Sequence, residues 1–352
     1  MDIYSLLKQV IETKGSDLHL SAGSVPMIRV HGELQAVSDE ILTPEALHTM
    51  LFSIINEEQQ RKYKETLELD LSIEPENISR FRVNMFHQRR GEGAVFRVIP
   101  TRIKTIEELG LPPALRYFLS LKRGLVLVTG PTGSGKSTSL AALIDELNRT
   151  RHEHIITIED PIEFVHHNQY CMVNQREVSS HTYSFANALK AALREDPDII
   201  LVGEMRDLET TQLAITAAET GHLVFATLHT SSAASTVDRI IDIFPPHQQS
   251  QIRTQLGNSL VGVVCQALVP RVDQEGRVCA MEIMFGTPAI RAQIREGKTH
   301  QINSMIQTSG KMGMQTLEQC LKALVMDGVI RGQDAYEFAS NKEAFAQYAP
   351  AG

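Results

Sequence analysis

Residues 125–147 read LVLVTGPTGSGKSTSLAALIDEL, and this stretch decides the fold. It opens on an apolar run typical of a buried strand and closes on 139–147, whose spacing predicts a helix. Between them, GPTGSGKST matches the pattern of a phosphate-binding loop. A strand that enters a glycine-rich loop and a helix that leaves it is the setting this motif requires. The sequence therefore predicts an α/β domain that binds a nucleotide.

The loop residues have distinct expected roles. Glycines let consecutive backbone N–H groups curl around the β and γ phosphates at a helix N-terminus. Lys136 adds a positive charge, and the Ser137 hydroxyl is placed to ligate Mg²⁺. The alternative, a chance glycine-rich turn, is disfavoured by the flanking strand and helix. The predicted ATP-binding residues are Gly130, Pro131, Thr132, Gly133, Ser134, Gly135, Lys136, Ser137 and Thr138.

Apolar strands alternate with helices downstream of the loop. The strands are carried by IITIED at 155–160, IILVGE at 199–204 and LVFATLHT at 223–230, and a helix is expected near 185–193. Such alternation predicts a parallel sheet covered on both faces. After about Val237 the strand signal fades, so we expect a mostly helical C-terminal portion.

Acidic residues follow two of these predicted strands. Glu159, Asp160 and Glu163 cluster after the first, where a carboxylate can orient or deprotonate an attacking water. Taken alone, the cluster could equally be a solvated acidic turn. Glu204 directly follows the next strand, and Gly203 stands where a metal-binding Asp is usual. We therefore expect Glu204 to act on Mg²⁺ through water or on the nucleophile.

An Arg–Asp pair and two histidines are the remaining charged candidates of this domain. Arg206 and Asp207 are interpreted as a surface pair. His222 precedes the last strand and His229 follows it, without the Cys or His spacing of a zinc site. His229 could be an ordinary surface or core group, or it could hydrogen-bond the γ phosphate and report its loss.

The first 99 residues read as a separate, small α+β domain. Strand-like segments surround a predicted helix at 44–64, and Gly91 and Gly93 are expected to form a hairpin turn. On that hairpin, Arg82 is expected on the polar face, whereas Arg97 is expected to interrupt an apolar face. These arginines could form an exposed ion pair, or they could act as arginine fingers on the γ phosphate.

The domain boundary is placed in a proline-marked segment. Pro100, Pro112 and Pro113 indicate a linker at 100–117, followed by an ATPase domain at 118–352.

Composition excludes several classes of protein. The net charge of 34 − 42 = −8 argues against a sequence-blind nucleic-acid binder. The longest nearly apolar run, 259–269, is far shorter than the roughly 20 residues of a membrane span. The N-terminus lacks the features of a secretory signal, and the four cysteines show no paired spacing. We expect a protein of the reducing cytosol.

Several linked segments resemble the secretion ATPase superfamily, and within it the type IV pilus retraction ATPases. The resemblance extends over nearly the whole chain and includes SDLHLSAG and FRVNMF of the first domain. It is carried by GPTGSGKST, ITIEDPIEF, ALREDPDIILVGEMRD and AAETGHLVFATLHT.

The resemblance implies an N-terminal PAS-like domain and a RecA-like ATPase core, assembled as a homohexamer with ATP bound between the domains. It implies that Glu163 is the catalytic carboxylate, Glu204 the Walker B glutamate, and His222 and His229 the histidine motif. It further matches two residues to arginine fingers, Arg82 and Arg97.

Two features favour retraction over pilus assembly. The chain lacks the tetracysteine zinc module of assembly ATPases, and AIRAQIRE at 289–296 resembles a retraction signature. By pattern this is an amphipathic helix with Arg291 and Arg295 exposed, and a plain surface helix is the alternative.

A retraction motor implies twitching motility, an inner-membrane platform protein as partner and a position on the cytoplasmic face of that membrane. A second retraction ATPase of the PilU type could assist it. Alternatives are that the chain is itself of the PilU type, a nucleotide-gated regulatory module without productive turnover, or, against its charge, a nucleic-acid motor.

Overall fold

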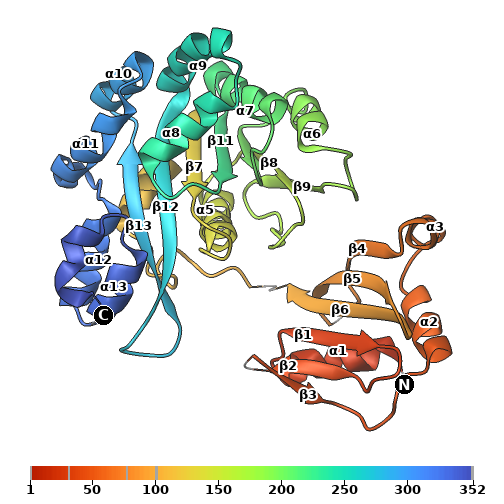
Figure 1. Ribbon diagram of the computed structural model, residues 1–352. Helices are drawn as coiled ribbons and strands as arrows, with labels where there is room; N and C mark the ends of the chain where they lie inside the picture. The colour runs from red at the N-terminus through yellow and green to blue at the C-terminus, as the bar shows by residue number, and fades with distance from the viewer. Residues whose placement is uncertain (1, 31, 77, 100–101, 350–352) are drawn as a thin grey trace. The chain divides into compact units, whose positions relative to one another are not determined.

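The computed structural model describes residues 2–30, 32–76, 78–99 and 102–349. They fall into two compact units, Met1–Arg102 and Ile103–Gly352 (Figure 1). Within the described ranges, no helix is long and apolar enough to cross a membrane.

The N-terminal unit is an antiparallel sheet with helices. The strand order is β3-β2-β1-β6-β5-β4, and α1 buries Leu7 and Val10 in a core that includes Phe81 and Phe96. The strands are β1 (Asp17–Ser21), β2 (Met27–Val30), β3 (Glu33–Ala36), β4 (Glu68–Ile73), β5 (Arg80–Gln88) and β6 (Gly91–Ile99). The helices are α1 (Ile3–Glu12), α2 (Pro44–Phe52) and α3 (Glu57–Thr66).

Local chemistry explains where this unit departs from prediction. The helix expected at 44–64 is two helices, because Asn56 and Gln59 form a capping box that starts α3 afresh. Gly91 has the positive φ of +124° at the hairpin, but Gly93 lies inside β6. A Cβ at Gly93 would come within 2.6 Å of the Phe86 ring, so this glycine is required by packing and not by a turn.

The second unit is built on a seven-stranded, parallel-rich sheet, as predicted. Its order is β13-β12-β7-β11-β10-β8-β9, and every neighbouring pair is parallel except β12 and β13. The strands are β7 (Gly124–Thr129), β8 (His154–Glu159), β9 (Met172–Glu177), β10 (Ile199–Val202), β11 (Leu223–Leu228), β12 (Leu260–Pro270) and β13 (Arg277–Phe285).

Helices connect and follow these strands. The α-helices are α4 (Arg116–Leu119), α5 (Lys136–Thr150), α6 (Phe185–Ala192), α7 (Leu208–Thr220), α8 (Ala233–Asp242), α9 (Pro246–Ser259), α10 (Pro288–Glu296), α11 (Ile302–Thr308), α12 (Leu317–Met326) and α13 (Gly332–Phe338). Short 3₁₀ turns are η1 (Pro113–Leu115), η2 (Thr299–Gln301), η3 (Gly310–Met312) and η4 (Lys342–Tyr348).

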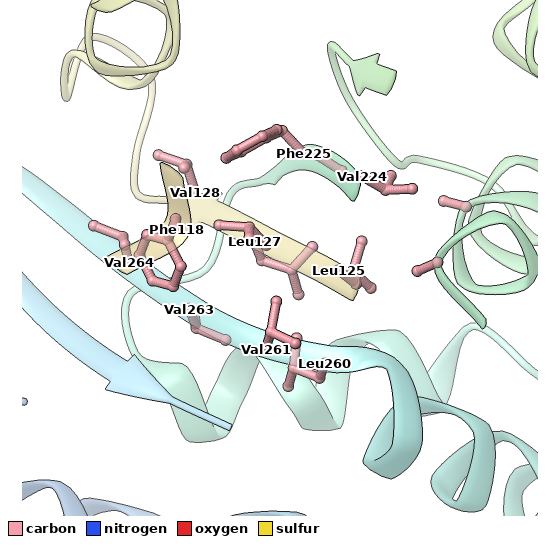
Figure 2. Packing of buried hydrophobic residues seen from close by; sticks show 14 of the residues in the cluster. Phe118, Leu125, Leu127, Val128, Val224, Phe225, Leu260, Val261, Val263 and Val264 are labelled. Atoms are coloured by element: carbon pink, nitrogen blue, oxygen red, sulfur yellow. The ribbon is translucent and has the colours of Figure 1, made fainter. Parts of the chain in front are cut away.

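The centre of this unit is a layer of buried apolar side chains around β7. Every residue of β7 and β11 is buried, as expected for strands with neighbours on both sides. Figure 2 shows side chains of β7, β11 and β12 packed together, among them Leu127, Phe225 and Val263. Burying one such side chain contributes about 1.5–3 kcal/mol, so this layer fixes the strand ends that carry the polar residues.

One prediction about strands was wrong, and one strand was not predicted. Strands do not fade after Val237, because β12 and β13 form a long antiparallel pair, seen side by side in Figure 1. The apolar run in β12 is a buried strand beside β7, with eight consecutive buried residues from Leu260. The edge strand β9 was also missed, since MVNQRE has too few apolar residues to signal a strand.

The predicted linker at 100–117 also differs from the structure. Ile106, Leu111 and Leu115 are buried in the apolar core of the second unit, so this unit begins at Ile103. Pro100, one of the residues that suggested the linker, lies outside the described residues.

Candidate functional site

A cavity of about 410 Å³ lies in the second unit where β7, β8, β10 and β11 end. Because these strands are parallel, their carboxyl ends share one edge of the sheet, where α/β proteins bind ligands. The lining residues are Thr132, Gly133, Gly135, Lys136, Ser137, Thr138, Glu159, Asp160, Pro161, Glu163, Phe185, Gly203, Glu204, Arg206, Thr227, His229, Leu268 and Arg277.

The glycine-rich loop has the conformation its sequence suggests. Gly130, Gly133 and Gly135 all have positive φ, and α5 begins directly after Gly135. A Cβ at Gly130 would lie 2.4 Å from the Gln266 carbonyl oxygen, so the loop approaches β12 too closely for a side chain. The backbone N–H groups at the start of α5 thus border the cavity, where they can receive phosphate.

Lys136 points its amine into a group of oxygens and nitrogens. Nζ donates to the carbonyl oxygens of Gly130 (2.8 Å) and Pro131 (3.0 Å) and lies 3.5 Å from Nδ1 of His229. Burial lowers the pKa of Lys136, while the carboxylates of Glu204 and Glu163 act in the opposite direction. Both predicted acidic residues therefore lie close enough to influence this amine.

Glu204 is held by two cationic or basic partners at the end of β10. Its carboxylate lies 2.7 Å from Nη2 of Arg206 and 3.2 Å from Nε2 of His229. Burial acts to raise the pKa of Glu204, but hydrogen bonds from Arg206 and His229 outweigh it and lower the pKa. The carboxylate is thus kept ionised, and His229 links it to Lys136.

The acidic segment after β8 faces the same cavity. Glu159, Asp160 and Glu163 all line it, which favours a functional cluster over a solvated turn. They differ in setting, since burial raises the pKa of Glu159 whereas Glu163 is exposed. An exposed carboxylate at the cavity is the better placed of the two to meet an attacking water.

Arg206, Asp207 and His222 have other settings than the sequence suggested. Arg206 and Asp207 are not a surface pair, because Arg206 pairs with Glu204 and Asp207 caps α7 by accepting from the backbone N–H of Thr210. His222 does not line the cavity; it stands at the amino end of β11, where Nδ1 lies 2.9 Å from the Ala217 carbonyl oxygen.

The two hairpin arginines lie on neighbouring strands of the N-terminal unit. Arg82 of β5 is opposite Arg97 of β6. Arg97 shares its face of β6 with Val95, which is half-buried, and Ile99, which is buried, while Ala94 and Phe96 are buried on the other face. An ion pair of Arg97 is present, with its Nε donating to Asp17 at 2.8 Å, but only the arginine is exposed, because the Asp17 side chain is buried.

Four residues of the cavity wall escaped sequence reasoning. Leu268 and Arg277 come from the β12–β13 pair, which the sequence did not reveal. Phe185 begins α6. Thr227 lies inside β11, in a segment where the sequence singled out only the histidines.

The oxygen donors in the cavity fit a hard divalent cation. Ser137 supplies a hydroxyl and Glu204 a carboxylate, the ligand types that Mg²⁺ prefers. The described residues contain no group of three or more His, Cys, Asp or Glu arranged to hold a metal ion. This composition suits an ion that takes its remaining ligands from water and phosphate.

Comparison with known proteins gives a consistent result. The family described as type II/IV secretion system protein matches residues 1–323. The type IV pilus retraction ATPase PilT of Pseudomonas aeruginosa is 54% identical over 345 residues, covering 98% of this chain and 100% of that protein. The type IV pilus ATPase PilU of the same organism is 42% identical over 341 residues, covering 97% and 89%.

A solved structure agrees in fold as well as sequence. The crystal structure of the pilus retraction motor PilT with bound ADP matches with a TM-score of 0.93 and 45% identity, covering 99% of each chain.

Proposed function

Since this chain belongs to the family of type II/IV secretion system proteins, we propose that it is an ATP-hydrolysing motor that retracts type IV pili and so supports twitching motility. One observation carries the proposal: the glycine-rich loop, Glu163, Glu204 and His229 surround a single cavity at the carboxyl edge of the sheet. The 54% identity to a pilus retraction ATPase over nearly the whole chain supports retraction as the work that ATP hydrolysis drives.

ATP binding starts at the loop and α5. Residues 130–138 supply backbone N–H groups, and Lys136 exchanges the carbonyl oxygens of Gly130 and Pro131 for phosphate oxygens. Ser137, with Glu204 acting directly or through water, would hold Mg²⁺, which neutralises charge on the β and γ phosphates when bound. Before ATP binds, the hydrogen bonds from Lys136 to these two carbonyl oxygens hold the loop in its conformation. ATP binding replaces them with bonds to phosphate.

Hydrolysis needs a base and a sensor near the γ phosphate. Glu163 receives the proton of the attacking water, and Glu204 orients the reacting groups. His229, at the end of β11, contacts both Lys136 and Glu204, so a movement of either side chain changes the contacts of His229. Loss of the γ phosphate would therefore change the hydrogen bonds among Lys136, His229 and Glu204.

The assembled state completes the site. In the proposed homohexamer, Arg82 and Arg97 of one subunit act on ATP bound by another, and His222 belongs to the interface that transmits the change. Leaving its Asp17 partner would free Arg97 for phosphate. The Arg97 side chain is 69% exposed, whereas the Asp17 side chain that it leaves is 6% exposed and keeps a hydrogen bond from the Ser16 hydroxyl. Sequential ATP turnover would then move N-terminal units as rigid bodies.

The motor needs a partner at the membrane. We place it at the cytoplasmic face of the inner membrane, in contact with the pilus platform protein and with no nucleic-acid partner. Helix α10 carries AIRAQIRE: Ile290 and Ile294 are fully buried and Arg295 is exposed, whereas Arg291, expected to be exposed, is half-buried. Its exposed side is a candidate contact for retraction.

A PilU-type role is the nearest alternative, supported by 42% identity to PilU. Pilus retraction can be followed in a deletion strain complemented with this chain or with its Lys136→Ala variant. We expect the native chain alone to restore retraction and the variant to fail. Retraction only when a second retraction ATPase is present would favour the PilU-type role; retraction by the Lys136→Ala variant alone would contradict the motor proposal.

A further inference from the structure

Glu163 lies in a segment without regular structure. Residues 160–171, between β8 and β9, contain neither helix nor strand. Ile162 is buried at 2% exposure, while the next residue, Glu163, is exposed and lines the cavity. A carboxylate that must meet a reacting water needs a backbone held within a fraction of an ångström. Side chains from outside the segment supply that support.

Two hydrogen bonds from β9 bracket Glu163. The backbone N–H of Ile162 donates to Oε2 of Glu177 at 3.0 Å. The carbonyl oxygen of Phe164 accepts from Nε2 of Gln175 at 2.9 Å. Residues 175 and 177 are two apart on one strand, so their side chains share a face of the sheet edge. A backbone group of the residue before Glu163 and one of the residue after it are thus bonded to side chains of the same strand.

Gln175 extends the same support in both directions. Its Oε1 accepts from the backbone N–H of His166 at 2.7 Å, and its Nε2 also donates to Oε1 of Glu159 at 3.1 Å. One amide therefore joins the end of β8 to two points of the segment that follows it. Glu177, only 5% exposed, also accepts from the Ser180 hydroxyl at 3.0 Å.

We propose that Gln175 and Glu177 are positioning residues that fix the Glu163 carboxylate for ATP hydrolysis by fastening the backbone on either side of it. The inference rests on the proposed function, in which Glu163 is the base. Neither side chain lines the cavity, so they act through Glu163 and not on the nucleotide. A displacement of about 1 Å in such a group can cost roughly 100-fold in rate.

The test compares variants in full-length protein by phosphate release and ATP affinity. Gln175→Leu and Glu177→Ala should lower kcat by about 10- to 100-fold while leaving ATP affinity within about threefold, because the phosphate loop is untouched. Glu177→Gln, which keeps an oxygen for the Ile162 N–H, should retain most of kcat. The matched control is Asn174→Ala, an exposed residue that directly precedes Gln175 on β9 and whose side chain contacts His154 instead; its kcat should be unchanged.

A double-variant cycle separates positioning from general damage to the fold. In a Glu163→Gln background, Gln175→Leu should cause little further loss, because the group it positions is already gone. An equal further loss would overturn the proposal, as would a normal kcat in Gln175→Leu or a loss of kcat in Asn174→Ala as large as in the other variants. If Gln175→Leu does not fold, Gln175→Glu carries the same expectations, since it keeps the shape and loses the Nε2 donor.

The same measurements show whether a failure lies in the positioning role or in the role of Glu163 as the base. Full turnover in Glu163→Gln alone would refute the role of Glu163 in the proposed function. An inactive Glu163→Gln together with a fully active Gln175→Leu would refute only the positioning role.

Discussion

Arg206 controls the ionisation of Glu204, and its removal has a calculable effect. The two side chains meet at 2.7 Å between Nη2 and Oε2, but the Arg206 side chain is 65% exposed. Water and salt screen such a pair, so its strength is about 0.2–1 kcal/mol. Arg206→Gln should therefore raise the pKa of Glu204, because it removes this favourable interaction with the ionised carboxylate.

The sign of the pH effect follows from the direction of the shift. The pKa of Glu204 is lowered in the folded protein, where Arg206 and His229 outweigh the opposing effect of burial. The ionised carboxylate is therefore present at neutral pH and is lost as pH falls through that pKa. In Arg206→Gln this loss begins at a higher pH, so the acid limb of kcat/KM for ATP hydrolysis should move to higher pH.

The assay is phosphate release at subsaturating ATP across the acid range, at low and high salt. The shift should be smaller at high salt, where the native pair is already screened. Arg271→Gln is the control, because Arg271 pairs with Asp273 and lies outside the cavity wall. An acid limb that stays in place at low salt, or that moves to lower pH, would refute this account of Glu204.

Three further results are expected. Gly130→Ala should abolish nucleotide binding, measured by fluorescence of a labelled nucleotide, because a Cβ there meets the Gln266 carbonyl at 2.4 Å and the φ is +136°. Phe225→Ala should lower the free energy of unfolding by about 3–5 kcal/mol in urea titration, since this ring is fully buried. Asp17→Asn should lower stability by about 1–3 kcal/mol at pH 7. Ser16 and Arg97 outweigh burial and lower the pKa of Asp17, so the difference from the native protein should shrink as pH falls below that pKa in acid unfolding curves.

The centre of the fold could be predicted because its signals are local. The strand, loop and helix around Lys136 follow from consecutive residues, and the parallel order follows from alternating apolar runs. The β12–β13 pair could not be found this way, because a buried strand of continuous apolar residues has the same pattern as a buried helix. Strand β9 carries polar residues such as Gln175 that bond to the irregular segment before it, and no periodicity reports such contacts.

In the candidate site, too, some residues could be placed from the sequence and others could not. Glu163, Glu204 and His229 could be placed because each follows a predicted strand in a parallel sheet. The pairing of Arg206 with Glu204 was missed because neighbours in sequence gave no reason to prefer it over Asp207. Arg277 was missed with its strand, since only the antiparallel return of β13 brings it to the cavity wall.

The most direct test of the account measures ATP binding and ATP turnover side by side in Glu163→Gln. The account predicts that ATP affinity stays within about threefold of the native protein while phosphate release falls by about 10²- to 10⁴-fold, the range of a lost general base. Phosphate release at the native rate, from a variant that binds ATP normally, would contradict it.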